Sequence, residues 1–133
     1  MKKILVIEDE IFIRENLLEL LEIEGFQAVG AENGNVGVQL AREQRPNLIL
    51  CDVMMPELDG YGVLDALRED PATATIPFLF LTASADRNNL QKIRQLGMDD
   101  YILKPFNVDK FLAAISARMD KPTANESNNT ASL

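Results

Sequence analysis

Residues 48–62 have the sequence LILCDVMMPELDGYG, in which four consecutive apolar residues lead directly into an aspartate, Asp52. A short apolar run without polar interruption is typical of a strand that is buried on both faces, as in a parallel sheet. A charged side chain destabilises a buried strand, because removing a carboxylate from water costs free energy unless the carboxylate is paired or bound to a metal. Asp52 is therefore expected to lie in a charged site at the end of a strand.

The same arrangement recurs along the chain. Glu8 and Asp9 follow the run ILVI, and Lys104 follows YIL. Apolar runs predict five strands, at residues 4–7, 28–31, 48–51, 78–81 and 101–103. Stripes of helical period between and after them predict five helices, marked by Ile13, Leu17, Leu20 and Leu21, by Val36, Leu40 and Ala41, by Val63, Leu64 and Leu67, by Leu90, Ile93 and Leu96, and by Val108, Phe111, Leu112, Ile115 and Met119.

Alternating strands and helices indicate a doubly wound α/β domain. Such βαβ units have right-handed crossovers and build one parallel sheet with helices on both faces. Ligands bind to these sheets outside the carboxyl ends of the strands, at the point where the strand order reverses. The charged residues at the strand ends are expected to meet there.

The composition limits the classes of partner. A net charge of −8 argues against a surface that binds nucleic acid or an anionic membrane directly. The single cysteine excludes an intrachain disulfide framework and a multi-cysteine zinc site, and the absence of histidine removes the commonest metal ligand and general base. No apolar stretch approaches the roughly eighteen residues that span a bilayer, and the first apolar run ends too early for a signal peptide, so the protein is predicted to be cytoplasmic.

One domain and a tail are expected from the 133 residues. Residues 1–120 are predicted to form the domain. Residues 121–133, KPTANESNNTASL, are polar and lack periodicity, so they are predicted to be a disordered tail. The start at MKK and this tail favour a free protein over a fragment of a larger one.

The strand-end residues predict a site for a metal and a phosphoryl group. Glu8, Asp9 and Asp52 carry three negative charges, which Mg²⁺ and the Lys104 ammonium would neutralise. Thr82 ends the fourth predicted strand, so its hydroxyl can donate to an incoming phosphoryl oxygen. A strand-end aspartate or threonine often only caps the next helix, but four strand ends that agree on one chemistry favour the phosphate and metal interpretation.

The strings ILVIEDE, LILCDVMMPELDGYG, FLFLTA and DDYILKPF resemble the receiver domain of bacterial two-component response regulators, over residues 3–119. The resemblance is to the stand-alone, chemotaxis-receiver-like type. It implies a flavodoxin-like fold with a five-stranded parallel sheet in the order 2-1-3-4-5, an order that periodicity alone does not provide.

The resemblance also implies roles for the site residues. Asp52 would be the phosphoacceptor. Asp9 and Asp52 would bind Mg²⁺ directly, with Mn²⁺ as a substitute. The backbone carbonyl of Met54 would be a third ligand, and Glu8 would act through water. The family often has aspartate at the position of Glu8, but glutamate keeps the charge.

The remaining roles concern the phosphoryl group and the switch. Lys104, Thr82 and the backbone of Ala83 would bind the phosphoryl group, and Lys104–Pro105 would be a cis peptide bond. Thr82 and Tyr101 would be the switch pair that alters the surface of the fourth helix, fifth strand and fifth helix. Met54 and Ser84 stand at positions that tune hydrolysis in relatives, which leaves the phosphoryl lifetime open.

The function expected from this resemblance is that of a phosphoacceptor switch. The phosphoryl donor would be a histidine kinase or a phosphotransfer protein, and the output would be binding to an unidentified downstream protein. The protein would be a monomer or a phosphorylation-dependent dimer. No enzymatic activity is expected beyond self-directed phosphorylation and slow autodephosphorylation.

Two alternatives remain open. A small Mg²⁺-dependent phosphohydrolase could use Asp52 as its nucleophile, but hydrolases of the haloacid dehalogenase type usually carry an acid two residues later, where this chain has Met54. A receiver-like interaction module that is never phosphorylated is the second alternative. Degenerate receivers usually lose the acidic pair, the acceptor or the lysine, and this chain has all of them.

Overall fold

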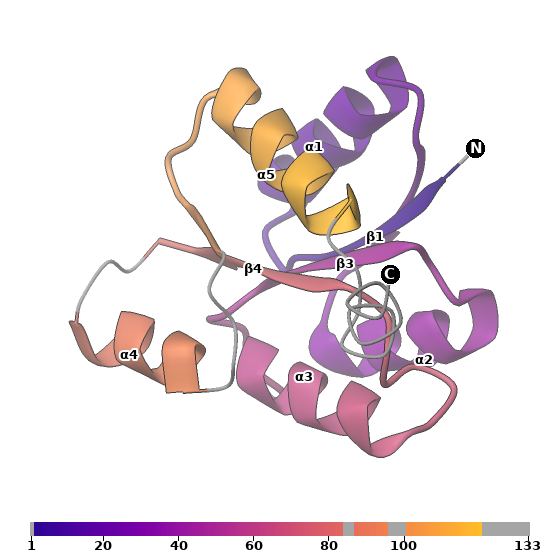
Figure 1. The fold of residues 1–133 in the computed structure, drawn as a ribbon, viewed down its shortest axis with the longest axis vertical. Coiled ribbons are helices and arrows are strands. Elements are labelled where there is room, and N and C mark those ends of the chain that lie inside the picture. The colour runs from indigo at the N-terminus through magenta and orange to yellow at the C-terminus, as the bar shows by residue number, and fades with distance from the viewer. Residues whose placement is uncertain (1, 84–86, 96–100, 121–133) are drawn as a thin grey trace, which may run out of the picture.

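The computed structural model describes residues 2–83, 87–95 and 101–120 (Figure 1). The predicted tail and Ser84 therefore lie outside the described residues. Strands and helices alternate along the chain in the order β1 (Lys3–Ile7), α1 (Ile11–Ile23), β2 (Gln27–Ala31), α2 (Gly34–Gln44), β3 (Leu48–Asp52), α3 (Gly60–Glu69), β4 (Phe78–Thr82), α4 (Arg87–Gln95), β5 (Tyr101–Leu103) and α5 (Val108–Asp120).

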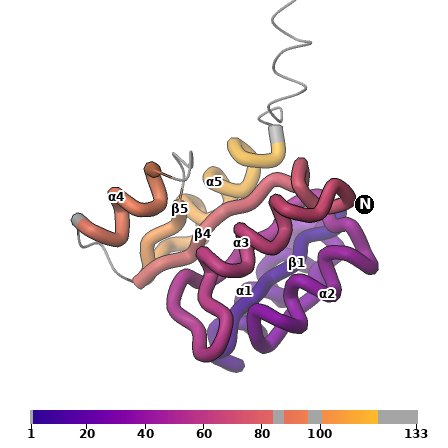
Figure 2. Tube along the Cα trace, turned by 90° about the horizontal axis from the view of Figure 1, so that it is seen from below, coloured from indigo at the N-terminus to yellow at the C-terminus, as the bar shows by residue number. Residues whose placement is uncertain are grey.

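The five strands form one parallel sheet in the order β2-β1-β3-β4-β5, as predicted. Helices α1 and α5 cover one face, and α2, α3 and α4 lie on the other (Figure 1). Figure 2 shows this second face, where α3 lies between α2 and α4 and α4 is on the side of β5. None of the helices in the described part of the chain is long and apolar enough to cross a membrane.

Two apolar clusters, one on each face of the sheet, form the core. Alternate side chains of a strand enter opposite clusters, so that Leu50 packs on one face and Cys51 on the other. The prediction of burial on both faces holds for β3 and β4, in which every residue is buried. It was wrong for the two edge strands: residues 28–30 of β2 are half-buried and Leu103 of β5 is exposed, because each of these strands is paired on one side only.

The loop after β3 is held close to the strand end. The Asp59 side chain caps α3 by accepting a hydrogen bond from the Gly62 N–H at 2.9 Å. The Gly60 N–H donates to the Val53 carbonyl at 2.9 Å. A Cβ on Gly60 would lie 2.5 Å from the Asp52 carbonyl oxygen, so only glycine allows this approach. The DG pair of the quoted segment thus fixes the backbone around Asp52.

Candidate functional site

The site lies at the carboxyl edge of the sheet. Asp52 is the last residue of β3, and Thr82 is the last residue of β4. Glu8 follows β1, and its N–H donates to the Ala31 carbonyl of β2 at 3.0 Å. Lys104 follows β5, and its N–H donates to the Thr82 carbonyl at 2.8 Å. These backbone bonds continue the sheet pairing past the strands, so the functional side chains start from a rigid base.

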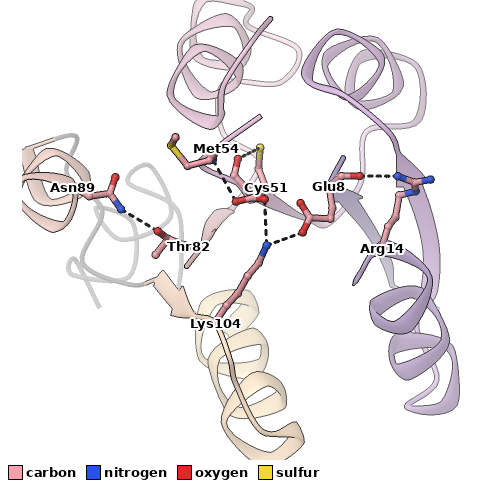
Figure 3. Close-up of polar contacts among 8 residues, drawn as sticks. Glu8, Arg14, Cys51, Met54, Thr82, Asn89 and Lys104 are labelled. Atoms are coloured by element: carbon pink, nitrogen blue, oxygen red, sulfur yellow. Dashed lines mark hydrogen bonds and ion pairs between the residues drawn. The ribbon is translucent and has the colours of Figure 1, made fainter. Parts of the chain in front are cut away.

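Lys104 supplies the positive charge between the carboxylates (Figure 3). Its Nζ lies 2.6 Å from Glu8 Oε1 and 3.1 Å from Asp52 Oδ2. The side chains of Lys104, Glu8 and Asp52 are 15%, 0% and 11% exposed, respectively. Water screens such buried charges weakly, so the lysine is needed to hold the two acids together.

Three carboxylates offer a hard, all-oxygen donor set. Oxygens of Glu8, Asp9 and Asp52 lie within 4.8 Å of one another. Within the described residues, Glu8 Oε2 is buried without a hydrogen-bond partner, which leaves an acceptor for a cation or its water. Asp9 is exposed, so water can reach the cluster from that side. The donor set fits Mg²⁺, which takes oxygen ligands and retains several waters.

Burial and neighbouring charges change the proton affinities of the site. Burial, followed by the neighbouring Asp52, raises the pKa of Glu8 to about 8. Burial lowers the pKa of Lys104, but the bonds and charges of Glu8 and Asp52 outweigh it and leave that pKa raised. Burial also raises the pKa of the neighbouring Cys51 thiol, which agrees with a packing role for this residue.

A dependence of stability on pH follows from the raised pKa of Glu8. Below the ordinary value of 4.5, the side chain is protonated in both the folded and the unfolded protein. Between this value and about 8 only the folded protein keeps the proton, so the free energy of unfolding falls as the pH rises. Without metal, we expect a loss of a few kcal/mol, at most about 5 kcal/mol, across this window, measured by urea denaturation.

The matched variants for this measurement are Glu8→Gln and Glu19→Gln. Glu8→Gln removes the titrating group and is expected to flatten the profile. Glu19 is an exposed residue of α1, so Glu19→Gln should keep the profile of the parent protein. A Glu8→Gln profile as steep as that of the parent would show that another group titrates.

The other predicted residues take the following places. Met54 follows β3, and its N–H donates to Asp52 Oδ1 at 3.3 Å, while its side chain is exposed. The Lys104–Pro105 peptide bond is cis. Tyr101 is half-buried and packs against the apolar cluster on the α2–α3 face. Ala83 is exposed after β4. The metal, phosphoryl and switch roles of these residues stay predictions.

Three residues at the site were missed in the sequence. Arg14 of α1 donates from Nη1 to the Glu8 carbonyl at 2.8 Å, which fixes the peptide between Glu8 and Asp9. Asn89 of α4 donates from Nδ2 to Thr82 Oγ1 at 2.9 Å (Figure 3). The hydroxyl of Tyr61 is bonded to Asn89 Oδ1. These polar residues on helices carry no local signal, because their contacts depend on how each helix is rotated against the sheet.

A parallel sheet in the order 2-1-3-4-5, with an acidic cluster and a lysine at its carboxyl edge, defines a receiver domain. The family model of the response regulator receiver domain matches residues 4–116. The chain belongs to this family, the receiver domains of two-component signalling.

Similar sequences occur in a short chemotaxis protein and in a longer transcriptional regulator. A probable chemotaxis protein CheY from Rhizobium etli is 38% identical over 116 residues, which are 86% of this chain and 90% of that protein. A probable transcriptional regulator ycf27 from Cyanophora paradoxa is 41% identical over 92% of this chain. The match spans only about half, 51%, of the length of that regulator.

A solved structure connects the family to a metal. The receiver domain of the sensor histidine kinase PA1611 from Pseudomonas aeruginosa was solved with a magnesium ion coordinated in its active site cleft. It is 28% identical to this chain, with a TM-score of 0.82 over 90% of this chain and 98% of that one. This chain groups three carboxylates, those of Glu8, Asp9 and Asp52, at the carboxyl edge of its sheet.

Proposed function

We propose that this protein is a phosphoacceptor switch in which Asp52 receives a phosphoryl group from a histidine kinase or a phosphotransfer protein. The observation that carries the proposal is the position of Asp52 at the sheet edge, where its carboxylate lies 3.1 Å from the Lys104 ammonium. The Met54 N–H donates to this carboxylate, and the loop after β3 lies against the Asp52 backbone. A nucleophile held beside a cation is suited to accept an anionic group.

Mg²⁺ is the proposed cofactor, with Mn²⁺ as a substitute. Asp9, Asp52 and the backbone carbonyl of Met54 would hold it, and Glu8 would act through water. The unpartnered Glu8 Oε2 among the described residues supports this assignment. When bound, the metal supplies positive charge that offsets the charge of the phosphoryl oxygens.

The transfer itself is a nucleophilic substitution at phosphorus. An Asp52 carboxylate oxygen forms a bond to phosphorus, and the phosphorus–nitrogen bond of a phosphohistidine donor breaks with its electron pair on the imidazole. The Lys104 ammonium then turns from the carboxylates toward the phosphoryl oxygens. The Thr82 hydroxyl and the backbone of Ala83 donate to the same oxygens.

The output is proposed to be a change in the surface formed by α4, β5 and α5. Thr82 supports this role because it is fully buried at the end of β4 and already contacts α4 through Asn89. Tyr101 begins β5, two residues before Leu103, which pairs with Thr82. A hydroxyl that moves toward the phosphoryl group vacates space that the Tyr101 ring can enter, and an unidentified downstream protein would recognise the altered surface.

Incubation of the full chain with acetyl phosphate tests the proposal. With Mg²⁺, we expect the intact mass to increase by one phosphoryl group, because acetate is a good leaving group. With a chelator in place of Mg²⁺, the increase should disappear. No increase with Mg²⁺, from acetyl phosphate or from a phosphorylated histidine kinase, would contradict the proposed function and favour a module that is never phosphorylated.

A further inference from the structure

We propose that Asn89 is a positioning residue, which holds the Thr82 hydroxyl on α4 and thereby opposes its movement to the phosphoryl group. This inference rests on the proposed function and adds to it a restraint on the resting state. Three contacts carry it: the bond from Asn89 to Thr82, the bond from Tyr61 to Asn89, and the packing of Lys92 on the Tyr61 ring.

The first contact sets the direction of the Thr82 hydroxyl. Asn89 Nδ2 donates to Thr82 Oγ1 at 2.9 Å. In Figure 3, the hydroxyl points toward Asn89, on the side of Thr82 away from Lys104. Thr82 is fully buried and Asn89 is half-buried, so water can reach this bond only from the Asn89 side. To donate to a phosphoryl group on Asp52, the hydroxyl must turn away from Asn89.

The second contact sets the orientation of the Asn89 amide. An amide presents an oxygen acceptor on one side and an NH₂ donor on the other. The Tyr61 hydroxyl donates to Asn89 Oδ1, which leaves the NH₂ group facing Thr82. Tyr61 thus makes Asn89 a donor to Thr82 in the resting protein.

The third contact holds Tyr61 and α4 together. The Tyr61 ring lies 5.4 Å from the ring of the buried Phe80 of β4, and Lys92 Nζ lies 4.2 Å from the Tyr61 centroid. Asn89 and Lys92 are three residues apart on α4, so they share one face of this helix. One tyrosine of α3 therefore restrains the face of α4 that reaches Thr82.

The consequence is a competition for one hydroxyl. Asn89 holds it in the resting state, and a phosphoryl group on Asp52 attracts it to the site. Removal of the Asn89 donor lowers the cost of that movement and favours the phosphorylated conformation. Damage to the fold would have the opposite effect, because a distorted site binds a phosphoryl group less well.

The test is the affinity of the full chain for beryllofluoride, which mimics a phosphoryl group on a carboxylate, measured by calorimetry in the presence of Mg²⁺. Asn89→Ala is expected to bind beryllofluoride about two- to tenfold more tightly than the parent. This factor corresponds to the net free energy that one hydrogen bond contributes. Tyr61→Phe removes one hydroxyl and should tighten binding to a smaller extent. Asn88→Ala, an exposed neighbour on α4, is the matched control and should bind like the parent.

The outcomes separate the two proposals. If the parent binds beryllofluoride and Asn89→Ala binds it equally or less tightly, the positioning role is overturned while the proposed function stands. If the parent does not bind it at all, both fail. If circular dichroism shows that Asn89→Ala is unfolded, the beryllofluoride affinity of Tyr61→Phe is the deciding measurement. An affinity of Tyr61→Phe equal to or below that of the parent overturns the positioning role of Asn89.

Discussion

Asp52→Asn is expected to take up no phosphoryl group from acetyl phosphate and Mg²⁺, whereas the parent protein takes up one. The amide keeps the shape of the side chain, but it is a poor nucleophile and cannot form the acyl phosphate. The substitution also removes one of the two carboxyl groups that contact Lys104, which still has Glu8 at 2.6 Å. The fold should therefore persist, and intact-mass spectrometry measures the uptake.

Asp59→Asn is the matched control for this loss. Asp59 lies in the loop after β3 and caps α3 through a hydrogen bond from the Gly62 N–H at 2.9 Å. Asparagine caps helices as well as aspartate, so this variant should be as stable as the parent and take up one phosphoryl group. Uptake by Asp52→Asn at the level of the parent would place the acceptor on another residue.

Lys104→Met is expected to have two opposite effects. Without metal at pH 8, it should destabilise the fold by about 3 kcal/mol, because it leaves two largely buried carboxylates without their cation. The loss should be smaller at pH 6, where Glu8, with its pKa of about 8, is protonated. Urea denaturation at the two pH values measures this effect.

The second effect concerns the metal and the phosphoryl group. Lys104→Met removes a positive charge that repels Mg²⁺, so we expect roughly tenfold tighter binding of Mg²⁺ by calorimetry. Phosphoryl uptake should nevertheless fall, because the phosphoryl oxygens lose their ammonium partner. Lys110→Met, at an exposed position of α5, should match the parent in all three measurements. Weaker Mg²⁺ binding by Lys104→Met would show that the lysine organises the carboxylates instead of competing with the metal.

The fold was largely predictable because its signals are local. The runs ILVI, LILC and FLFL are long enough for a strand and too short for a helix, and the stripes between them have helical period. The order of the strands came from the family resemblance, because periodicity does not determine which strands are neighbours. The partial exposure of β2 was missed for the same reason, since an edge strand is defined by its neighbours.

The candidate site was predictable to the level of residue types. Any acid, hydroxyl or amine directly after a parallel strand comes to the carboxyl edge, so Glu8, Asp52, Thr82 and Lys104 could be placed together. The distances between these side chains could not be predicted. The sequence does not show that Glu8 is fully buried or that its pKa rises to about 8, because desolvation depends on every neighbour that covers the side chain.

By itself, the sequence determined the class of fold, the edge of the sheet that carries the site and the residues that reach this edge. All three follow from short apolar runs and from the residues that terminate them. Only the tertiary structure decided that Lys104 bridges Glu8 and Asp52, that Arg14 holds the Glu8 carbonyl, and that Asn89 holds Thr82. Such contacts depend on strand register and helix rotation, which the packing of the whole core sets and no local segment encodes.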